Sequence, residues 1–136
     1  MSTENKHSAY IRENGKSSYA VDITVSGYDL AGDEPTVMAG GDLGPAPYDF
    51  LIAALGECTV MTIRWYALQK SWPVDHVAAS VTHHKENGQD VFHKTITITG
   101  DQLTAEQREK LLDVAAKCPV QKTLLSTPSI TTKWGE

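Results

Sequence analysis

The stretch from Leu51 to Lys70, LIAALGECTVMTIRWYALQK, limits what this chain can fold into more than any other part of it. It is long, mostly apolar and free of proline, which is typical of a helix that packs in a core. We predict that the helix begins near Pro47, because proline suits the first turn of a helix. It should end near Ser71, because the residue before Pro73 is disfavoured in helical geometry. The rest of the chain is then expected to pack on this helix.

Strand-like segments lie on both sides of the predicted helix. SAYIR and SSYAVDITVSG, residues 8–12 and 17–27, are rich in β-branched and aromatic residues, and Asn14-Gly15 between them is a turn signal. The Gly-, Pro- and Asp-rich residues 27–49 predict a loop with a short strand. Two alternating segments, residues 76–86 and 91–100, flank Asn87-Gly88 and predict a hairpin. The first segment would carry Val77, Ala79, Val81 and His83 on one face, and the second would carry Phe92, Lys94, Ile96 and Ile98 on one face.

Two shorter helices and a strand complete the predicted order of elements. Thr104 and Gln107 have the spacing of a capping box that opens a helix. CPVQKTLL, residues 118–125, predicts a short helix, and SITTKW, residues 129–134, predicts a closing strand. Strands, a long helix, a hairpin, helices and a last strand make an α+β fold, with an antiparallel sheet packed on the long helix. At 136 residues we expect a single domain, residues 1–136.

Charge and hydropathy exclude several classes of function. The net charge is −5 and lysines and arginines form no run, so we expect no nucleic-acid partner. No window contains eighteen uninterrupted apolar residues, so we expect no membrane span. MSTENKHSAY at the start is polar and lacks the apolar segment of a signal peptide, so we expect a cytoplasmic protein.

Nothing in the sequence predicts a metal or an organic cofactor. His83 and His84 are adjacent on a predicted strand and would point to opposite faces, so they cannot readily share one ion. The glycines of GGDLG, residues 40–44, lack both the spacing and the lysine of a nucleotide-binding loop.

The two cysteines are the candidate reactive groups. Cys118 precedes Pro119 and would lie at the start of a helix, where amide groups and the helix dipole lower the pKa of a thiol. Cys58 lies well inside the long helix beside apolar neighbours, which should raise its pKa. If Cys58 is a nucleophile, a cation must therefore reach it from another segment. The alternative to a reactive pair is that both thiols only fill the core, because free cysteine is among the most buried residue types.

GGDLGPAPYDFLIAALGECTVMTIRWYALQKSWP, residues 40–73, resembles the osmotically inducible protein C and organic hydroperoxide resistance family (OsmC/Ohr), and CPVQKTL resembles the second cysteine motif of that family. The resemblance implies an intertwined homodimer with the long helices at its centre. It also implies a thiol-dependent peroxidase that reduces a small organic hydroperoxide and is reset by a thiol reductant. By motif position, Cys58 would be the peroxidatic thiol and Cys118 the resolving thiol.

The sequence departs from the motif of the family's peroxidases at the groups that position the reacting thiolate. Those members carry a glutamate soon after the motif proline, where this chain has Tyr48 and then Asp49. The resemblance also implies an arginine from the N-terminal strands. Arg12 is the first choice, with Asp49 orienting it, and Arg64 is the second. The sequence therefore resembles the less characterised OsmC-like members more than the peroxidases, and a non-catalytic protein that binds a small molecule or senses redox state is the alternative function.

Overall fold

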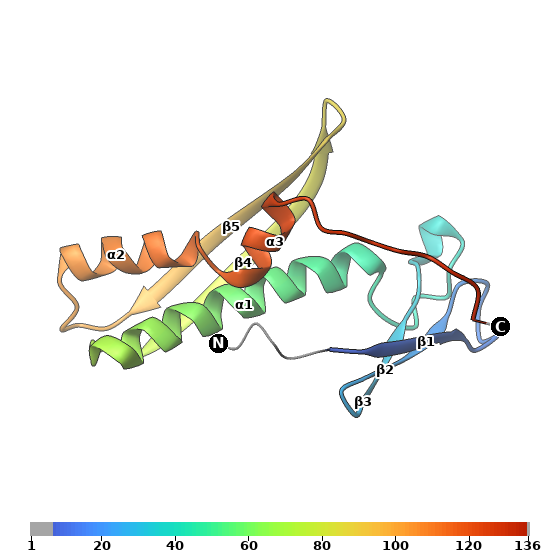
Figure 1. Ribbon diagram of the computed structural model, residues 1–136, viewed down its shortest axis with the longest axis horizontal. Coiled ribbons are helices and arrows are strands. Elements are labelled where there is room, and N and C mark those ends of the chain that lie inside the picture. The colour runs from blue at the N-terminus through green and yellow to red at the C-terminus, as the bar shows by residue number, and fades with distance from the viewer. Residues whose placement is uncertain (1–6, 136) are drawn as a thin grey trace. The chain divides into compact units, whose positions relative to one another are not determined.

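The computed structural model describes residues 7–135, which fall into two units divided between Leu51 and Ile52 (Figure 1). Each unit contains one antiparallel sheet, and α1 (Pro47–Lys70) crosses the division. The predicted α+β class is confirmed. That both units belong to one domain stays a prediction.

The sheet of the N-terminal unit has the strand order β1-β2-β3 and consists of β1 (Ala9–Glu13), β2 (Val21–Val25) and β3 (Tyr28–Gly32). A tight turn joins β2 to β3 at Ser26 and Gly27, whose φ angles are 50° and 83°. Asn14-Gly15 instead begins a longer loop, because β1 ends at Glu13 and β2 starts only at Val21. The expected turn is therefore present as part of a wider connection.

The loop after β3 is organised by the carboxylate of Asp33. This side chain is buried and accepts hydrogen bonds from Oγ of Ser17 at 2.9 Å and from the backbone N of Glu34 at 2.7 Å. It also accepts from the backbone N of Gly41 at 3.0 Å and of Leu43 at 3.3 Å. One carboxylate thus holds together a segment that has little regular structure beyond the short 3₁₀ helix η1 (Thr36–Met38).

The hairpin of the C-terminal unit forms as predicted from β4 (His76–Glu86) and β5 (Gln89–Thr99). Asn87 and Gly88 have φ angles of 51° and 79°, the left-handed pair that a two-residue hairpin turn requires. Val77 pairs with Ile98 and Val81 with Lys94, so the register places the predicted faces of the two strands on the same side of the hairpin. The polar residues between them are exposed.

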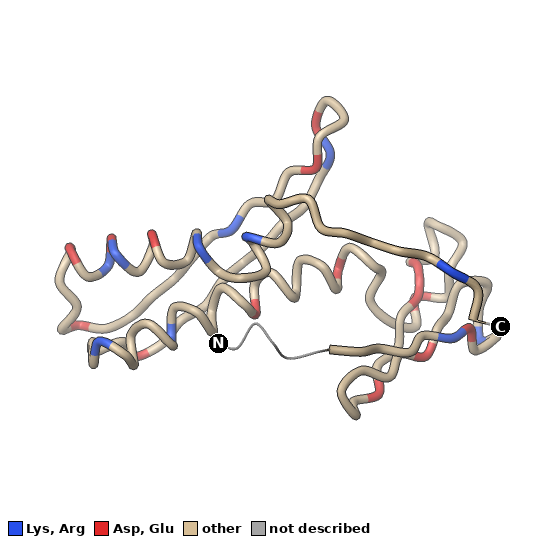
Figure 2. The backbone as a smooth tube through the Cα atoms, in the orientation of Figure 1, with Lys and Arg blue, Asp and Glu red and all other residues tan. Residues whose placement is uncertain are grey.

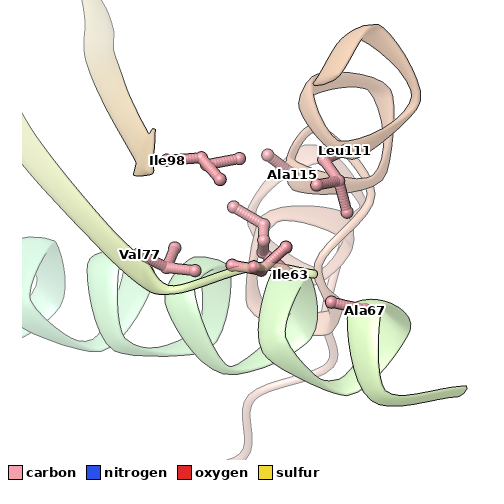
Figure 3. Close-up of a cluster of buried hydrophobic side chains, with 7 residues drawn as sticks. Ile63, Ala67, Val77, Ile98, Leu111 and Ala115 are labelled. Carbon is pink, nitrogen blue, oxygen red and sulfur yellow. The ribbon is translucent and has the colours of Figure 1, made fainter. Parts of the chain in front are cut away.

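A core cluster joins α1, the hairpin and α2 (Ala105–Ala115) (Figure 3). Ile63 of α1 and Leu111 of α2 are fully buried, and Figure 3 shows both side chains in the cluster, with Val77 and Ile98 of the hairpin at its other side. The capping box of Thr104 and Gln107 is present and fixes the start of α2. The expected packing of a sheet on the long helix is confirmed. The cluster consists of Ile63, Ala67, Val74, Val77, Ile98, Leu111 and Ala115.

The C-terminal segment differs from the prediction. α3 (Pro119–Leu125) is the expected short helix, but residues 127–135 form no strand. Ile130 and Trp134 are 84% and 86% exposed. A β-type sequence becomes a strand only where a neighbouring strand pairs with it, and among residues 7–135 none pairs with this segment. The prediction of a closing strand at SITTKW is wrong for the single chain.

By length and composition alone, one helix within residues 7–135, α1, would be able to cross a membrane. Charged positions are sparse along α1 and frequent along α2 (Figure 2). The packing of α1 is that of a core helix, because one side of it is covered by the chain itself. Its buried residues are Leu55, Cys58, Thr59, Thr62, Ile63 and Ala67.

Candidate functional site

The two cysteines lie together in a second buried cluster of the C-terminal unit. Cys58 is on α1, and Cys118 is the residue that caps the start of α3. With Leu55 they form one cluster, although sixty positions separate them in the sequence. Both thiols are free, and they are 6% and 0% exposed. The predicted helix start at Cys118-Pro119 is confirmed and brings the two sulfur-bearing residues together.

Each sulfur has a defined polar neighbour. The backbone N of Val120, in the first turn of α3, donates to Sγ of Cys58 at 3.4 Å. Oγ1 of Thr59 lies 3.5 Å from Sγ of Cys118 and donates to the backbone O of Leu55 at 2.7 Å. Thr59 is fully buried. α1 and α3 therefore supply polar contacts to each other's cysteine.

Lys94 brings a positive charge into this cluster from β5. Its Nζ donates to the backbone O of Ala115 at 2.6 Å and to Oγ1 of Thr59 at 3.0 Å. The residue is half-buried on the inward face of the hairpin. Burial lowers the pKa of Lys94, while the nearby thiols of Cys118 and Cys58 act to raise it.

The pKa values of the two thiols are displaced in opposite directions. Burial raises the pKa of Cys58, and the neighbouring Cys118 raises it further against the hydrogen bond from Val120. Burial also acts to raise the pKa of Cys118, but hydrogen bonds from Thr59, the Gln121 amide and Cys58 oppose it. The charge of Lys94 adds to that opposition, so the pKa of Cys118 is lowered. Both directions agree with what the sequence led us to expect.

A cavity of about 500 Å³ adjoins the thiol cluster. It shares Leu55 and Phe92 with that cluster, and Lys94 also lines it. Leu124 and Leu125 of α3 make another part of the wall apolar. Gln89, Asp90 and Gln121 make a further part of the wall polar, so a small molecule with both apolar and polar parts would fit this space.

Arg12 and Asp49 lie in the N-terminal unit, where their described contacts are local. Nη2 of Arg12 is 3.7 Å from a carboxylate oxygen of Asp22, and both side chains are exposed. Asp49 accepts from the backbone N of Ala46 at 2.9 Å and so caps the start of α1. The structure therefore leaves the predicted roles of these two residues untested.

Arg64, the second candidate for the arginine that activates Cys58, has a structural role. It donates to the backbone O of Val74 at 2.9 Å and of Asp75 at 3.4 Å, which fixes the chain between α1 and β4. The cation that does lie in the thiol cluster is Lys94, which we did not predict as a site residue. Its signal was present, because a lysine on the same strand face as Phe92, Ile96 and Ile98 must find polar partners inside.

The fold and this site define a class: a small α+β protein with a long core helix and two cysteines that meet at the start of a short helix. The sequence profile of the OsmC-like protein family matches residues 40–133, and the chain belongs to that family. Among proteins with curated descriptions, no sequence matches the chain.

Solved structures share the fold at low sequence identity. A protein from Psychrobacter arcticus, described as an osmotic stress induced and detoxification response protein, is 20% identical with a TM-score of 0.70, and the match covers 90% of this chain and 91% of that one. The OsmC-like protein of Mycoplasma pneumoniae is 18% identical with a TM-score of 0.70, over 90% and 89% of the two chains. The organic hydroperoxide resistance protein OhrB of Bacillus subtilis is 20% identical with a TM-score of 0.61, over 88% and 90%.

Proposed function

We propose that this protein is a thiol-dependent peroxidase that reduces small organic hydroperoxides through Cys58 and Cys118. The observation that supports it most is the meeting of the two cysteines in one buried cluster beside a cavity with a partly apolar wall. Membership of the OsmC-like family and the fold of OhrB, whose name describes organic hydroperoxide resistance, agree with it.

The proposed reaction has three steps. The thiolate of Cys58 attacks one oxygen of the hydroperoxide, the O–O bond breaks, and an alcohol leaves as Cys58 becomes a sulfenic acid. Cys118 then attacks the sulfur of that sulfenic acid, and a disulfide forms with loss of water. An external thiol reductant restores both thiols by exchange.

We further propose Arg12 and Asp49 as the pair that activates Cys58, on the resemblance of the motif. A cation is required because burial raises the pKa of Cys58. Asp49 is one methylene shorter than the glutamate that the resemblance implies, and its carboxylate already caps the start of α1. The proposed role is orientation of the arginine.

The test is consumption of tert-butyl hydroperoxide or cumene hydroperoxide with dithiothreitol as reductant. The native chain should consume peroxide catalytically, and Cys58→Ser should reduce the rate to that of dithiothreitol alone. Cys118→Ser should react once and then accumulate overoxidised Cys58. A native chain that consumes no more peroxide than Cys58→Ser would refute the proposal.

We propose a homodimer as the working form. Met61, Trp65 and Leu68 follow one another at helical spacing on α1, and they are 56%, 48% and 66% exposed. Arg64 and the start of β4 border this apolar face, which also has a cavity of about 390 Å³. An apolar face of this kind on a core helix is typical of a subunit interface.

The proposed location is the cytoplasm, where a thiol reductant is available.

A second function is favoured by the burial of the thiols. Cys118 is 0% exposed, and neither cysteine lines the adjoining cavity. A non-catalytic protein that holds a small apolar molecule there, or senses redox state, would have this arrangement. Binding of an alkyl compound by both the native chain and Cys58→Ser, without peroxide consumption by either, would favour it.

A further inference from the structure

A lysine amine lies inside the thiol cluster, and within residues 7–135 no carboxylate forms a hydrogen bond or an ion pair with it. Nζ of Lys94 contacts two neutral oxygens, the carbonyl of Ala115 at 2.6 Å and the hydroxyl of Thr59 at 3.0 Å. Lys94 is half-buried, and a charged amine partly removed from water is more stable when an opposite charge lies near it. An ionisable acidic group near Lys94 would therefore be stabilised in its negatively charged form.

The elements packed around Lys94 show which acidic groups lie close enough to its amine. α1 presents Thr59 and Cys58, the end of α2 presents a carbonyl, and the loop before α3 presents Cys118. Across the sheet, Lys94 pairs with Val81, which is apolar. The acidic groups that face the amine from these elements are the two thiols.

Asp90 lines the same cavity as Lys94, but its carboxylate is already engaged. One oxygen is 2.9 Å from Nε2 of His83, and the other is 3.6 Å from Nζ of Lys85. Asp90 therefore does not take the place of a thiolate as the partner of Lys94.

The hydroxyl of Thr59 connects the amine to one particular sulfur. Its oxygen accepts from Lys94, which leaves the hydroxyl proton to point either to the carbonyl of Leu55 at 2.7 Å or to Sγ of Cys118 at 3.5 Å. When Cys118 is a thiolate, a donor polarised by a cation becomes a charge-assisted hydrogen bond to sulfur. Sγ of Cys58 instead accepts from the backbone N of Val120.

We propose that Lys94, acting through Thr59, stabilises the thiolate of Cys118 and so prepares it to resolve oxidised Cys58. This inference rests on the proposed peroxidase function. In the step concerned, Sγ of Cys118 attacks Sγ of the Cys58 sulfenic acid, the S–S bond forms and the S–O bond breaks. The leaving hydroxide takes a proton from solvent and departs as water. Lys94 and Thr59 are positioning residues, since neither forms a bond to the peroxide or to sulfur.

The first test measures the charge on Cys118 and needs no peroxide. In Cys58→Ser the remaining thiol is Cys118, and its ionisation can be followed by the ultraviolet absorbance of the thiolate as pH rises. Adding Lys94→Met should raise the apparent pKa of Cys118, and adding Lys94→Arg should restore most of the effect. Thr59→Val removes the bridging hydroxyl at similar volume and should also raise it. Because Thr59→Val leaves Lys94 in place, it keeps the test valid if Lys94→Met fails to fold.

The matched control is Lys117→Met. Lys117 is next to Cys118 in the sequence, but its amine is exposed and pairs with Asp113 at 3.1 Å. This variant should leave the apparent pKa of Cys118 unchanged. An unchanged value in both Lys94→Met and Thr59→Val would overturn the proposal, and so would an equal rise in Lys117→Met.

The second test measures resolution in the chain with both cysteines. After one equivalent of tert-butyl hydroperoxide, acid-quenched samples should show disulfide closure slowed on the order of tenfold in Lys94→Met, as for a lost charge-assisted contact. Sulfinic acid at Cys58 should increase accordingly. A native rate of closure in Lys94→Met would overturn the role in resolution. If the thiolate titration responds to Lys94 while the native chain never reacts with peroxide, the charge assignment stands and the proposed peroxidase function fails.

Discussion

At the residue scale, the two thiols of this chain have different chemical surroundings although they are neighbours. Cys58 accepts a hydrogen bond from the backbone N of Val120, and Cys118 is within reach of a threonine hydroxyl that a lysine polarises. These surroundings favour the thiolate of Cys118, the proposed resolving thiol, over that of Cys58, the proposed peroxidatic thiol. The proposed attack on the hydroperoxide therefore still requires activation of Cys58.

Arg12→Ala tests that activation. If Arg12 supplies the cation for Cys58, its removal should slow peroxide-dependent oxidation of Cys58 by one to two orders of magnitude, the effect of losing a charge-assisted contact of about 1.5–3 kcal/mol. The rate is measured by stopped-flow under excess peroxide. Arg64→Ala is the comparison, and it should reduce stability rather than rate, because Arg64 donates to backbone carbonyls between α1 and β4. An unchanged oxidation rate in Arg12→Ala would remove Arg12 from the mechanism.

The sequence predicted part of this site and missed part of it for a definite reason. Cys118 at a helix start and Cys58 within a helix follow from local rules on proline and apolar spacing. Lys94 was placed on the correct strand face, but its partners are the hydroxyl of Thr59 and the carbonyl of Ala115, which are remote in sequence. Local patterns do not specify which buried carbonyl a lysine will meet. That information exists only in the packed structure.

At the element scale, the fold depends on a few polar anchors as well as on apolar packing. The β4–β5 hairpin and the capped α2 follow from short signals in the sequence, and both appeared where predicted. SITTKW does not form a strand, because strand formation requires a neighbouring strand and does not depend on the composition of the segment alone. The Asp33 loop was read only as a loop, because its order comes from hydrogen bonds to one carboxylate.

Asp33→Asn tests how far the Asp33 carboxylate makes the free energy of unfolding depend on pH. Burial acts to raise the pKa of Asp33, but hydrogen bonds from Ser17 and from the amides of Glu34, Leu43 and Gly41 outweigh it, and the pKa is lowered. The unfolded chain therefore binds this proton more readily. The stabilisation is full above the ordinary aspartate pKa and is lost as pH falls through the lower folded value. Urea unfolding between about pH 5 and about pH 2 should show a smaller acid loss of the free energy of unfolding in Asp33→Asn than in the native chain.

The exposed carboxylate of Asp101 provides the control for this measurement. Asp101→Asn should keep the acid loss of the native chain. Equal pH dependence in the native chain and in Asp33→Asn would show that the Asp33 carboxylate contributes nothing to stability through ionisation.

At the scale of the whole molecule, the apolar face of α1 predicts self-association. Sedimentation should show a dimer at micromolar concentration. Met61→Lys combined with Leu68→Lys should weaken it by at least about a hundredfold, or roughly 3 kcal/mol, because unpaired charges would be buried at the interface. Leu112→Lys is the matched control, since Leu112 is 59% exposed on α2 and Met61 is 56% exposed on α1. A native chain that sediments as a folded monomer would contradict the prediction.

The central claim is that Cys58 and Cys118 act as a redox pair within one chain, and the intact mass after oxidation tests it most directly. The native chain should be treated with one equivalent of tert-butyl hydroperoxide, quenched with acid and measured without reduction. The account predicts a monomer mass lower by two hydrogens, about 2 Da, with the Cys58 and Cys118 peptides joined. A mass higher by about 32 Da from sulfinic acid at Cys58, with Cys118 still free, would contradict it, and so would an unchanged mass.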